Sequence, residues 1–224
     1  MKKKVYRTIN IFLLIFTYVA VFLLGYTNDG YIQKRLEVNT PRDAIIRLIN
    51  GNDLFLIART NRANISKKRI IETSSSSDKP YAVIVTCPDS RLSAEHIFQE
   101  GIGDLFVIRS AGTIITDIDL ESIEYAVLNL GAKAIVVLGH TDCAAVSSTL
   151  YPHKEDSADS HITNHITPAI IYATSEEEAI FLNTRNSFYQ ILENQKFIEL
   201  INSKELIVSF AIYDMTTGKV DFMM

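Results

Sequence analysis

The chain has 224 residues, a hydrophobic content of 47% and a formal net charge of -4. This length is enough for one well-buried domain and a short extension. The acidic balance, with no strong basic block beyond the first residues, argues against nucleic-acid binding.

The N-terminal segment, residues 1–28, has the pattern of a signal peptide or a membrane anchor. Three of its first four residues are lysines, Arg7 follows, and the stretch from Thr8 to Asn28 carries no charge. About 20 apolar residues are needed to cross a hydrocarbon core of about 30 Å. No clear small-residue cleavage site follows, which favours an uncleaved anchor over a cleaved signal. Because positive residues stay in the cytoplasm, we expect the rest of the chain to face the periplasmic or extracellular side, or to be secreted after cleavage.

Residues 29–39 are predicted to form a linker, and a single domain is expected over residues 40–224. The run Thr40-Pro41-Arg42-Asp43 is typical of a helix start, with a threonine cap, proline in the first turn and an acid. We expect this helix to end near Gly51. The polar stretch from Lys67 to Pro80 contains four consecutive serines and is predicted to be a flexible loop.

Four apolar runs alternate with stretches of helical spacing such as residues 120–130. The runs are Tyr81–Thr86, Leu105–Ile108, Ala134–Leu138 and Leu206–Phe210. A continuous apolar run is expected for a strand that is covered on both faces. The pattern predicts an α/β fold with a mainly parallel central sheet flanked by helices.

Two clusters of polar residues follow the first and third of these runs. The first is Cys87-Pro88-Asp89-Ser90-Arg91 and the second is His140-Thr141-Asp142-Cys143. Open α/β sheets build their sites at the carboxyl ends of strands, so we expect the clusters to meet. Two thiolates, one imidazole and one carboxylate form a four-ligand set that suits zinc. Since Cys143 follows His140 by three residues, the first turn of a helix is predicted to present both.

Asp89 has two alternative roles in such a site. It can be the fourth metal ligand, or it can pair with Arg91 in a bidentate contact and leave a coordination position open for water. The two cysteines also admit a disulfide, which an exported location would permit. Their placement in ligand-bearing motifs favours a metal site over a disulfide.

Together, the Cys-x-Asp-Ser-Arg and His-x-x-Cys motifs resemble the zinc signature of the β-class carbonic anhydrases. The similarity runs from about Thr40 to the C-terminus. It includes Gly101–Gly112, Ser122–Val127, Val136–His140 and Ala211–Val220. The chain departs from the family pattern at Leu92-Ser93, Ser110, Ala144 and Phe210.

The resemblance implies an enzyme with one zinc ion per chain that interconverts carbon dioxide and bicarbonate. Cys87, His140 and Cys143 would hold the zinc, with Asp89 or water in the fourth position. Asp89 and Arg91 would be catalytic as a pair that opens and closes the site. The resemblance also implies a homodimer or a higher homo-oligomer, and the N-terminal segment adds the membrane as a partner.

Two other functions fit the same motifs. Related enzymes with the same ligand set hydrolyse carbon disulfide or carbonyl sulfide. A zinc-stabilised, catalytically silent surface module is the other alternative, and the intact pair of Asp89 and Arg91 argues against it, because a purely structural site needs no releasable ligand.

The remaining histidines have simpler interpretations. His153, His161 and His165 lie near Asp156 and Asp159 in a polar stretch. A second metal site or a proton relay is possible there, and solvated surface histidines are favoured.

Five further residues are expected to have structural roles. His96 is predicted to be structural and Asp142 to be a helix cap or a surface group. Tyr125 and Tyr213 are expected in the core or at an interface, and Arg109 near the site.

Overall fold

The structure is a computed structural model that describes residues 15–19, 36–57, 61, 63–75, 79–152 and 160–223. The chain divides into two compact units, Met1–Leu36 and Glu37–Met224. Most of the predicted anchor and residues 29–35 of the predicted linker lie outside the described residues. Within the described part of the chain, we find no helix with both the length and the apolar character needed to cross a bilayer.

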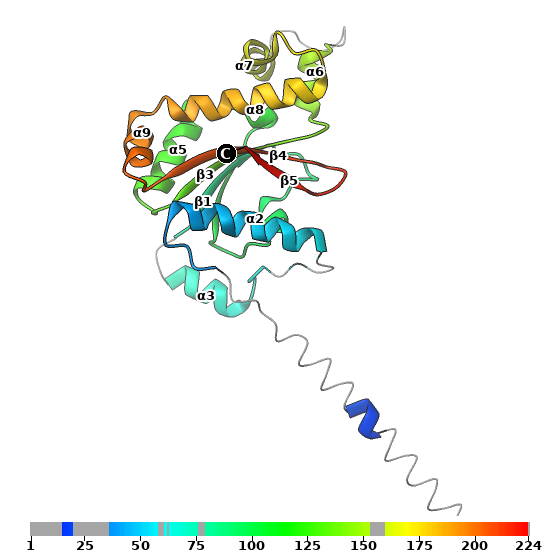
Figure 1. Cartoon of the computed structure of the whole chain (residues 1–224), viewed down its shortest axis with the longest axis vertical. Helices are drawn as coiled ribbons and strands as arrows, with labels where there is room; N and C mark the ends of the chain where they lie inside the picture. Colours follow the sequence, from blue (N-terminus) through cyan, green and yellow to red (C-terminus); the bar gives the residue numbers. More distant parts are fainter. Residues whose placement is uncertain are drawn as a thin grey trace, which may run out of the picture. The chain divides into compact units, whose positions relative to one another are not determined.

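The second unit is built on a five-stranded sheet with the order β2-β1-β3-β4-β5 (Figure 1). The strands are β1 (Ala82–Thr86), β2 (Leu105–Arg109), β3 (Ala134–His140), β4 (Ile207–Tyr213) and β5 (Val220–Met223). The first four are parallel, and β5 pairs with β4 in the antiparallel sense. The predicted mainly parallel sheet is confirmed, and every predicted apolar run is a strand. The edge strand β5 was not predicted.

Helices cover both faces of this sheet (Figure 1). One face packs against α2 (Pro41–Ile57) and α4 (Ala94–Ile97) through alternate strand residues such as Ile84 and Val136. The opposite face packs against α5 (Asp117–Leu128), α8 (Glu176–Leu192) and α9 (Gln195–Asn202). Along β1 and β3, the residues that point to either face of the sheet are buried, so these strands are apolar up to their last residues, Thr86 and His140.

A smaller apolar cluster lies beyond the strand ends. It is formed by α6 (Ala144–Leu150), α7 (His161–Ile170) and the first half of α8, and it includes both cysteines. A short 3-10 helix, η1 (Ala111–Thr113), follows β2 and contacts these helices. These elements bury the side chains of both cysteines.

Helix α2 begins as predicted and ends later than predicted. The Thr40 hydroxyl accepts a hydrogen bond from the Asp43 amide at 3.2 Å, and the Asp43 carboxylate accepts one from the Thr40 amide at 2.8 Å. The helix then continues through Gly51 to Ile57. A Cβ at Gly51 would lie 2.0 Å from the carbonyl oxygen of Phe98. This glycine therefore allows a close backbone approach and does not end the helix.

The predicted loop from Lys67 to Pro80 is wrong for its first part, because Lys67–Ser75 forms helix α3. None of the nine residues of this helix is buried. Arg69 attaches the helix instead, donating to the Ile102 carbonyl at 2.7 Å and to the Asp104 carboxylate at 2.9 Å. A helix that is held by polar contacts has no apolar stripe for sequence reasoning to detect.

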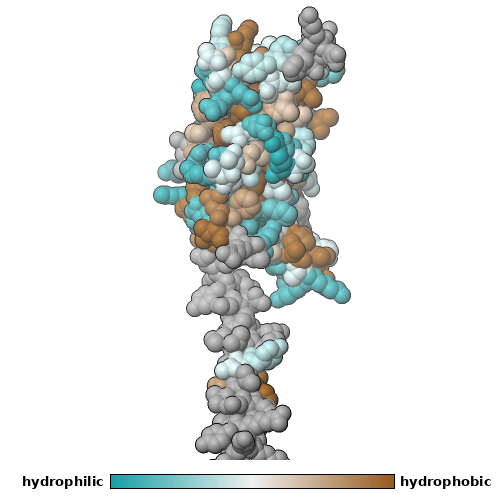
Figure 2. All heavy atoms as spheres, turned by 90° about the vertical axis from the view of Figure 1, so that its right-hand side faces the viewer, coloured by the Kyte–Doolittle hydropathy of each residue, from teal (hydrophilic) through white to brown (hydrophobic). Residues whose placement is uncertain are grey.

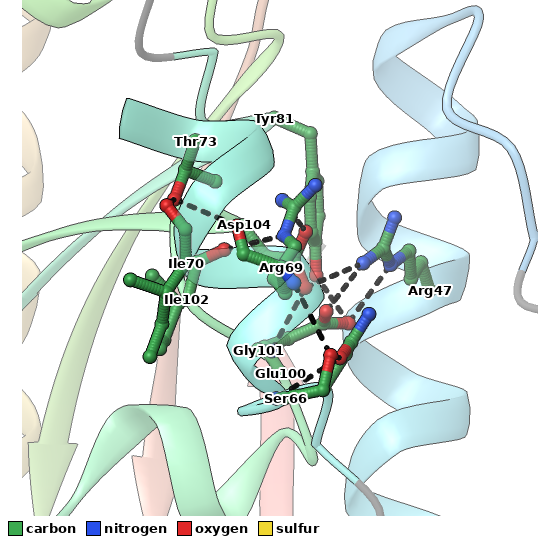
Figure 3. A network of polar contacts seen from close by, with 11 residues as sticks. Arg47, Ser66, Arg69, Ile70, Thr73, Tyr81, Glu100, Gly101, Ile102 and Asp104 are labelled. Atoms are coloured by element: carbon green, nitrogen blue, oxygen red, sulfur yellow. Dashed lines mark hydrogen bonds and ion pairs between the residues drawn. The ribbon is translucent and has the colours of Figure 1, made fainter. Parts of the chain in front are cut away.

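Figure 3 shows that Asp104 belongs to a larger network of charges. Arg47 of α2 pairs with Glu100 through two nitrogens and lies 3.3 Å from Asp104, while the Tyr81 hydroxyl donates to Glu100 at 2.9 Å. Burial, and then the Glu100 charge, raise the pKa of Tyr81 well above its ordinary value. With Arg69 included, two cations balance two anions, so the nearly buried carboxylate of Glu100 is compensated.

Candidate metal centre

The two predicted motifs meet at the ends of neighbouring parallel strands. Cys87 directly follows β1, His140 is the last residue of β3, and Cys143 is the N-cap of α6. All three are buried, and their potential ligand atoms lie within 4.8 Å of one another. The predicted presentation of His140 and Cys143 by one helical turn is wrong. The strand end supplies the imidazole, and the helix cap supplies the thiol.

The His140 ring has one satisfied nitrogen and one unsatisfied nitrogen. Nδ1 lies 2.9 Å from the backbone carbonyl oxygen of Thr141. A carbonyl only accepts, so Nδ1 carries a proton, and in the neutral ring Nε2 then carries the lone pair. Among the described residues, Nε2 is the only buried side-chain nitrogen or oxygen without a hydrogen-bond partner. A metal ion between this nitrogen and two sulfurs would satisfy it, so the residues present fit such an ion.

Both cysteines are free and buried, so the disulfide alternative is wrong for this structure. A hydrogen bond between the two sulfurs lowers the pKa of Cys87 to about 4 and raises that of Cys143, because the pair shares one proton. The backbone of Gly112 further lowers the pKa of Cys87, and that of Val146 opposes the rise at Cys143. The surroundings therefore favour a thiolate at Cys87, the form in which cysteine binds metals, while burial opposes the charge on both sulfurs.

Asp89 is paired with Arg91. The guanidinium Nε donates to Asp89 Oδ1 at 3.0 Å, and Nη2 donates to Oδ2 at 2.8 Å. Chiefly through these bonds, Arg91 lowers the pKa of Asp89 to about 2. Of the two predicted roles, the structure has the paired one, and the cluster of potential ligand atoms contains Cys87, His140 and Cys143 alone among the described residues.

Arg109 supports the loop that carries Asp89. Its Nη2 donates to the backbone carbonyls of Asp89 and Leu92, each at 2.8 Å. The predicted structural role of Arg109 near the site is confirmed. This loop is thus fixed from β2 as well as from β1.

Sequence reasoning missed two residues of α8 that hold η1 beside the cysteines. Asn183 donates to the Gly112 carbonyl at 2.6 Å, and Ser187 donates to the Thr113 carbonyl at 2.8 Å. Gly112 has a φ of 65° and Thr113 a φ of 58°, both in the left-handed region. The available signal was a pair of small polar side chains four residues apart on a helix, which places them on one face.

Three histidines outside the cluster have exposed side chains. His96 lies on α4 and is exposed, as are His161 and His165 on α7. The surface interpretation is confirmed for the last two. His153, Asp156 and Asp159 lie outside the described residues.

Of the two tyrosines, Tyr213 is buried and Tyr125 is exposed, so a core position is wrong for Tyr125. Asp142 is a surface group as predicted. However, its carboxylate also accepts a hydrogen bond from Arg91 at 2.6 Å, which was not predicted.

Comparison with known proteins identifies the family. A family model described as carbonic anhydrase matches residues 82–220. The chain belongs to the carbonic anhydrase family. The matched residues include the three clustered potential ligands, Cys87, His140 and Cys143, together with Asp89, Arg91 and Asp142.

Named relatives match a central part of this carbonic anhydrase family chain. Carbonic anhydrase 2 of Mycobacterium tuberculosis is 45% identical over 103 residues, which are 46% of this chain and 49% of the relative. A carbonic anhydrase of Synechococcus elongatus is 36% identical over 91 residues, 38% of this chain and 34% of the relative. The chain therefore spans about half the length, or less, of these relatives.

Solved structures share the fold. A β-carbonic anhydrase of Coccomyxa in complex with acetazolamide has a TM-score of 0.61 at 20% identity, over 70% of this chain and 78% of the other. One of two tetrameric β-carbonic anhydrases from Sordaria macrospora has a TM-score of 0.58 at 23% identity, over 70% and 87%. These likenesses confirm the β-carbonic anhydrase fold for the chain.

Proposed function

We propose that the protein catalyses the reversible hydration of carbon dioxide to bicarbonate and a proton with the help of zinc. The observation that carries this proposal is the buried cluster of two sulfurs and one unpartnered imidazole nitrogen beside a carboxylate that an arginine holds. A purely structural zinc site has four protein ligands. Three clustered donors with a fourth held aside are typical of a site with an open position.

Cys87, His140 and Cys143 would hold one zinc ion per chain. When bound, zinc supplies Lewis acidity that makes hydroxide available near neutral pH. The hydrogen bond of His140 Nδ1 to Thr141 orients the ring toward the ion. Burial of the three donors excludes competing water from the ligand side of the centre.

Asp89 and Arg91 would control the fourth position. With its pKa at about 2, the Asp89 carboxylate is ionised at neutral pH, so it is both a potential ligand and a hydrogen-bond acceptor. While Arg91 binds both of its oxygens, the carboxylate stays off the metal position and leaves room for water and substrate.

The full chain loaded with zinc is expected to accelerate carbon dioxide hydration in a stopped-flow assay. A chelator should abolish the acceleration, and added zinc should restore it. Turnover of carbon disulfide or carbonyl sulfide without carbon dioxide turnover would contradict the proposal in favour of the related hydrolase. Bound zinc with neither activity would leave the silent surface module.

We also propose that the protein is a homo-oligomer. The Sordaria macrospora structure of the same fold is described as tetrameric. Figure 2 shows hydrophobic and hydrophilic residues intermixed on one face of the molecule. Elsewhere, Ile118, Tyr125 and Leu128 are exposed along α5 at spacings of seven and three residues, so they share one helix face. Sedimentation should give at least a dimer, and an active monomer would contradict this.

For the location of the protein, we propose that the residues after the N-terminal segment lie on the outer side of the cytoplasmic membrane. The support is the basic start and the uncharged stretch from Thr8 to Asn28. Protease that is added outside an intact inner membrane should digest these residues. Protection until the inner membrane is lysed would overturn the placement.

A further inference from the structure

Arg91 is held by two carboxylates, which come from the two different metal motifs. Asp89 lies two residues before it, on the same loop after β1. Asp142 lies between His140 and Cys143, on the loop after β3. Arg91 Nη1 donates to Asp142 Oδ2 at 2.6 Å, and Nη2 donates to the Asp142 backbone carbonyl at 3.0 Å. Arg91 thus joins the loop that carries Asp89 to the loop that carries two of the donors.

The two carboxylates bind different edges of the guanidinium. Asp89 accepts from Nε and Nη2, whereas the Asp142 carboxylate accepts from Nη1. Asp142 therefore does not take a donor away from Asp89. All three guanidinium nitrogens are engaged, which fixes both the position and the plane of the group.

The backbone at Asp142 turns this residue toward Arg91. Asp142 has a φ of 57°, in the left-handed region that few residues other than glycine, asparagine and aspartate adopt readily. Its side chain is 74% exposed, and that of Arg91 is 49% exposed. These two side chains could extend into water, and instead they contact each other beside the three potential metal ligands.

We propose that Asp142 is a positioning residue that keeps Arg91 in the place where it holds Asp89 off the metal. This inference rests on the proposed function only in that the cluster binds a metal. A free arginine side chain samples many rotamers, and contact with Asp142 removes that freedom before Asp89 is bound. Without Asp142, Arg91 spends less time beside Asp89, and the freed carboxylate can occupy the fourth position.

An opposing effect is the negative charge of Asp142, which reduces the attraction of Arg91 for Asp89. This effect is the weaker one, because charges this exposed are screened by water and salt. The distinct guanidinium edges mean that the anchoring contact persists whether Asp89 is bound or released. Loss of Asp142 should therefore close the metal site.

The test uses the full chain loaded with cobalt in place of zinc, and thiocyanate as a small anionic probe of the open position. Visible absorption reports binding of the probe. If thiocyanate binds only the molecules whose fourth metal position is not occupied by Asp89, its apparent dissociation constant rises as the fraction of such molecules falls. Asp142→Asn and Asp142→Gly are the suitable variants, since both residues tolerate a positive φ.

We expect thiocyanate affinity to fall about three- to ten-fold in Asp142→Gly, and less in Asp142→Asn, which keeps a neutral acceptor. Cobalt content should be unchanged. Asp221→Asn is the matched control, because Asp221 is another exposed carboxylate in an ion pair, with Lys219. It should leave the affinity unchanged.

An affinity in Asp142→Gly within two-fold of the unchanged chain, or a tighter one, would overturn the proposal. Loss of cobalt from that variant would also overturn the proposal, since Asp142 would then be needed to keep His140 and Cys143 in place for metal binding. The titration requires no turnover. Failure of the unchanged chain to hydrate carbon dioxide would therefore reject the proposed function and leave the role of Asp142 to be decided by the cobalt protein.

Discussion

A Cys143→Ser chain is expected to bind less than about 5% of the zinc that the unchanged chain binds, because a serine hydroxyl stays protonated where a cysteine becomes a thiolate. The substitution nearly preserves volume and leaves Cys87 and His140 in place. Two donors then remain of the three that the structure clusters. Elemental analysis after gel filtration measures the loss, and full zinc occupancy would reject the ligand assignment.

Two controls separate metal loss from misfolding. His161→Ala removes an exposed histidine that lies outside the described cluster, so this variant should keep its zinc. Thermal unfolding of Cys143→Ser should match that of the unchanged chain after treatment with chelator. A variant that unfolds well below the metal-free chain would mean that Cys143 stabilises the fold independently of metal.

An Arg91→Ala chain is expected to keep its zinc and to lose about 100-fold in carbon dioxide hydration, as a site that changes from mostly open to mostly closed would. The structure gives the reason: Arg91 supplies both side-chain hydrogen bonds that hold the oxygens of Asp89. The backbone amide of residue 91, which donates to Asp89 Oδ1 at 2.9 Å, would remain, but Oδ2 would lose its arginine donor and could bind the metal. Initial rates and zinc content should be measured together from pH 7 to 9.

The matched control is Arg185→Ala. Arg185 lies on α8, where its guanidinium stacks over the Phe181 ring at 5.5 Å, and it has no contact with Asp89. This variant should retain full activity. Unchanged turnover of Arg91→Ala across the pH range would count decisively against the gating role, and zinc loss from Arg91→Ala would show that the arginine maintains the ligands themselves.

The sequence predicted those elements of the fold that are buried on both sides. β1 and β3 are entirely buried, so their apolar runs are unbroken and easy to recognise. β5 was missed because it is a four-residue edge strand in which burial is partial. Helix α3 was missed because none of its residues is buried, and its attachment depends on Asp104, far away in the sequence.

At the candidate site, too, some features could be predicted from the sequence and others could not. The residue types in the two motifs indicated a metal, and the structure brings Cys87, His140 and Cys143 together. The second contact of Arg91 was not predictable, because the left-handed backbone of Asp142 decides where its carboxylate points. Likewise, Asn183 and Ser187 act through a turn that the sequence did not reveal. In each case the information lies in three-dimensional proximity between distant segments.

The placement of the three donors just after β1, at the end of β3 and at the cap of α6 also bears on how the chain folds. The segment between Cys87 and His140 leaves β1, forms the edge strand β2 and returns through α5 to the other side of β1. Closing so long a loop is entropically costly and must precede any shared contact with an ion. Metal capture should therefore be a late event in refolding. An ion held by the three donors would act as a crosslink that opposes separation of the two central strands.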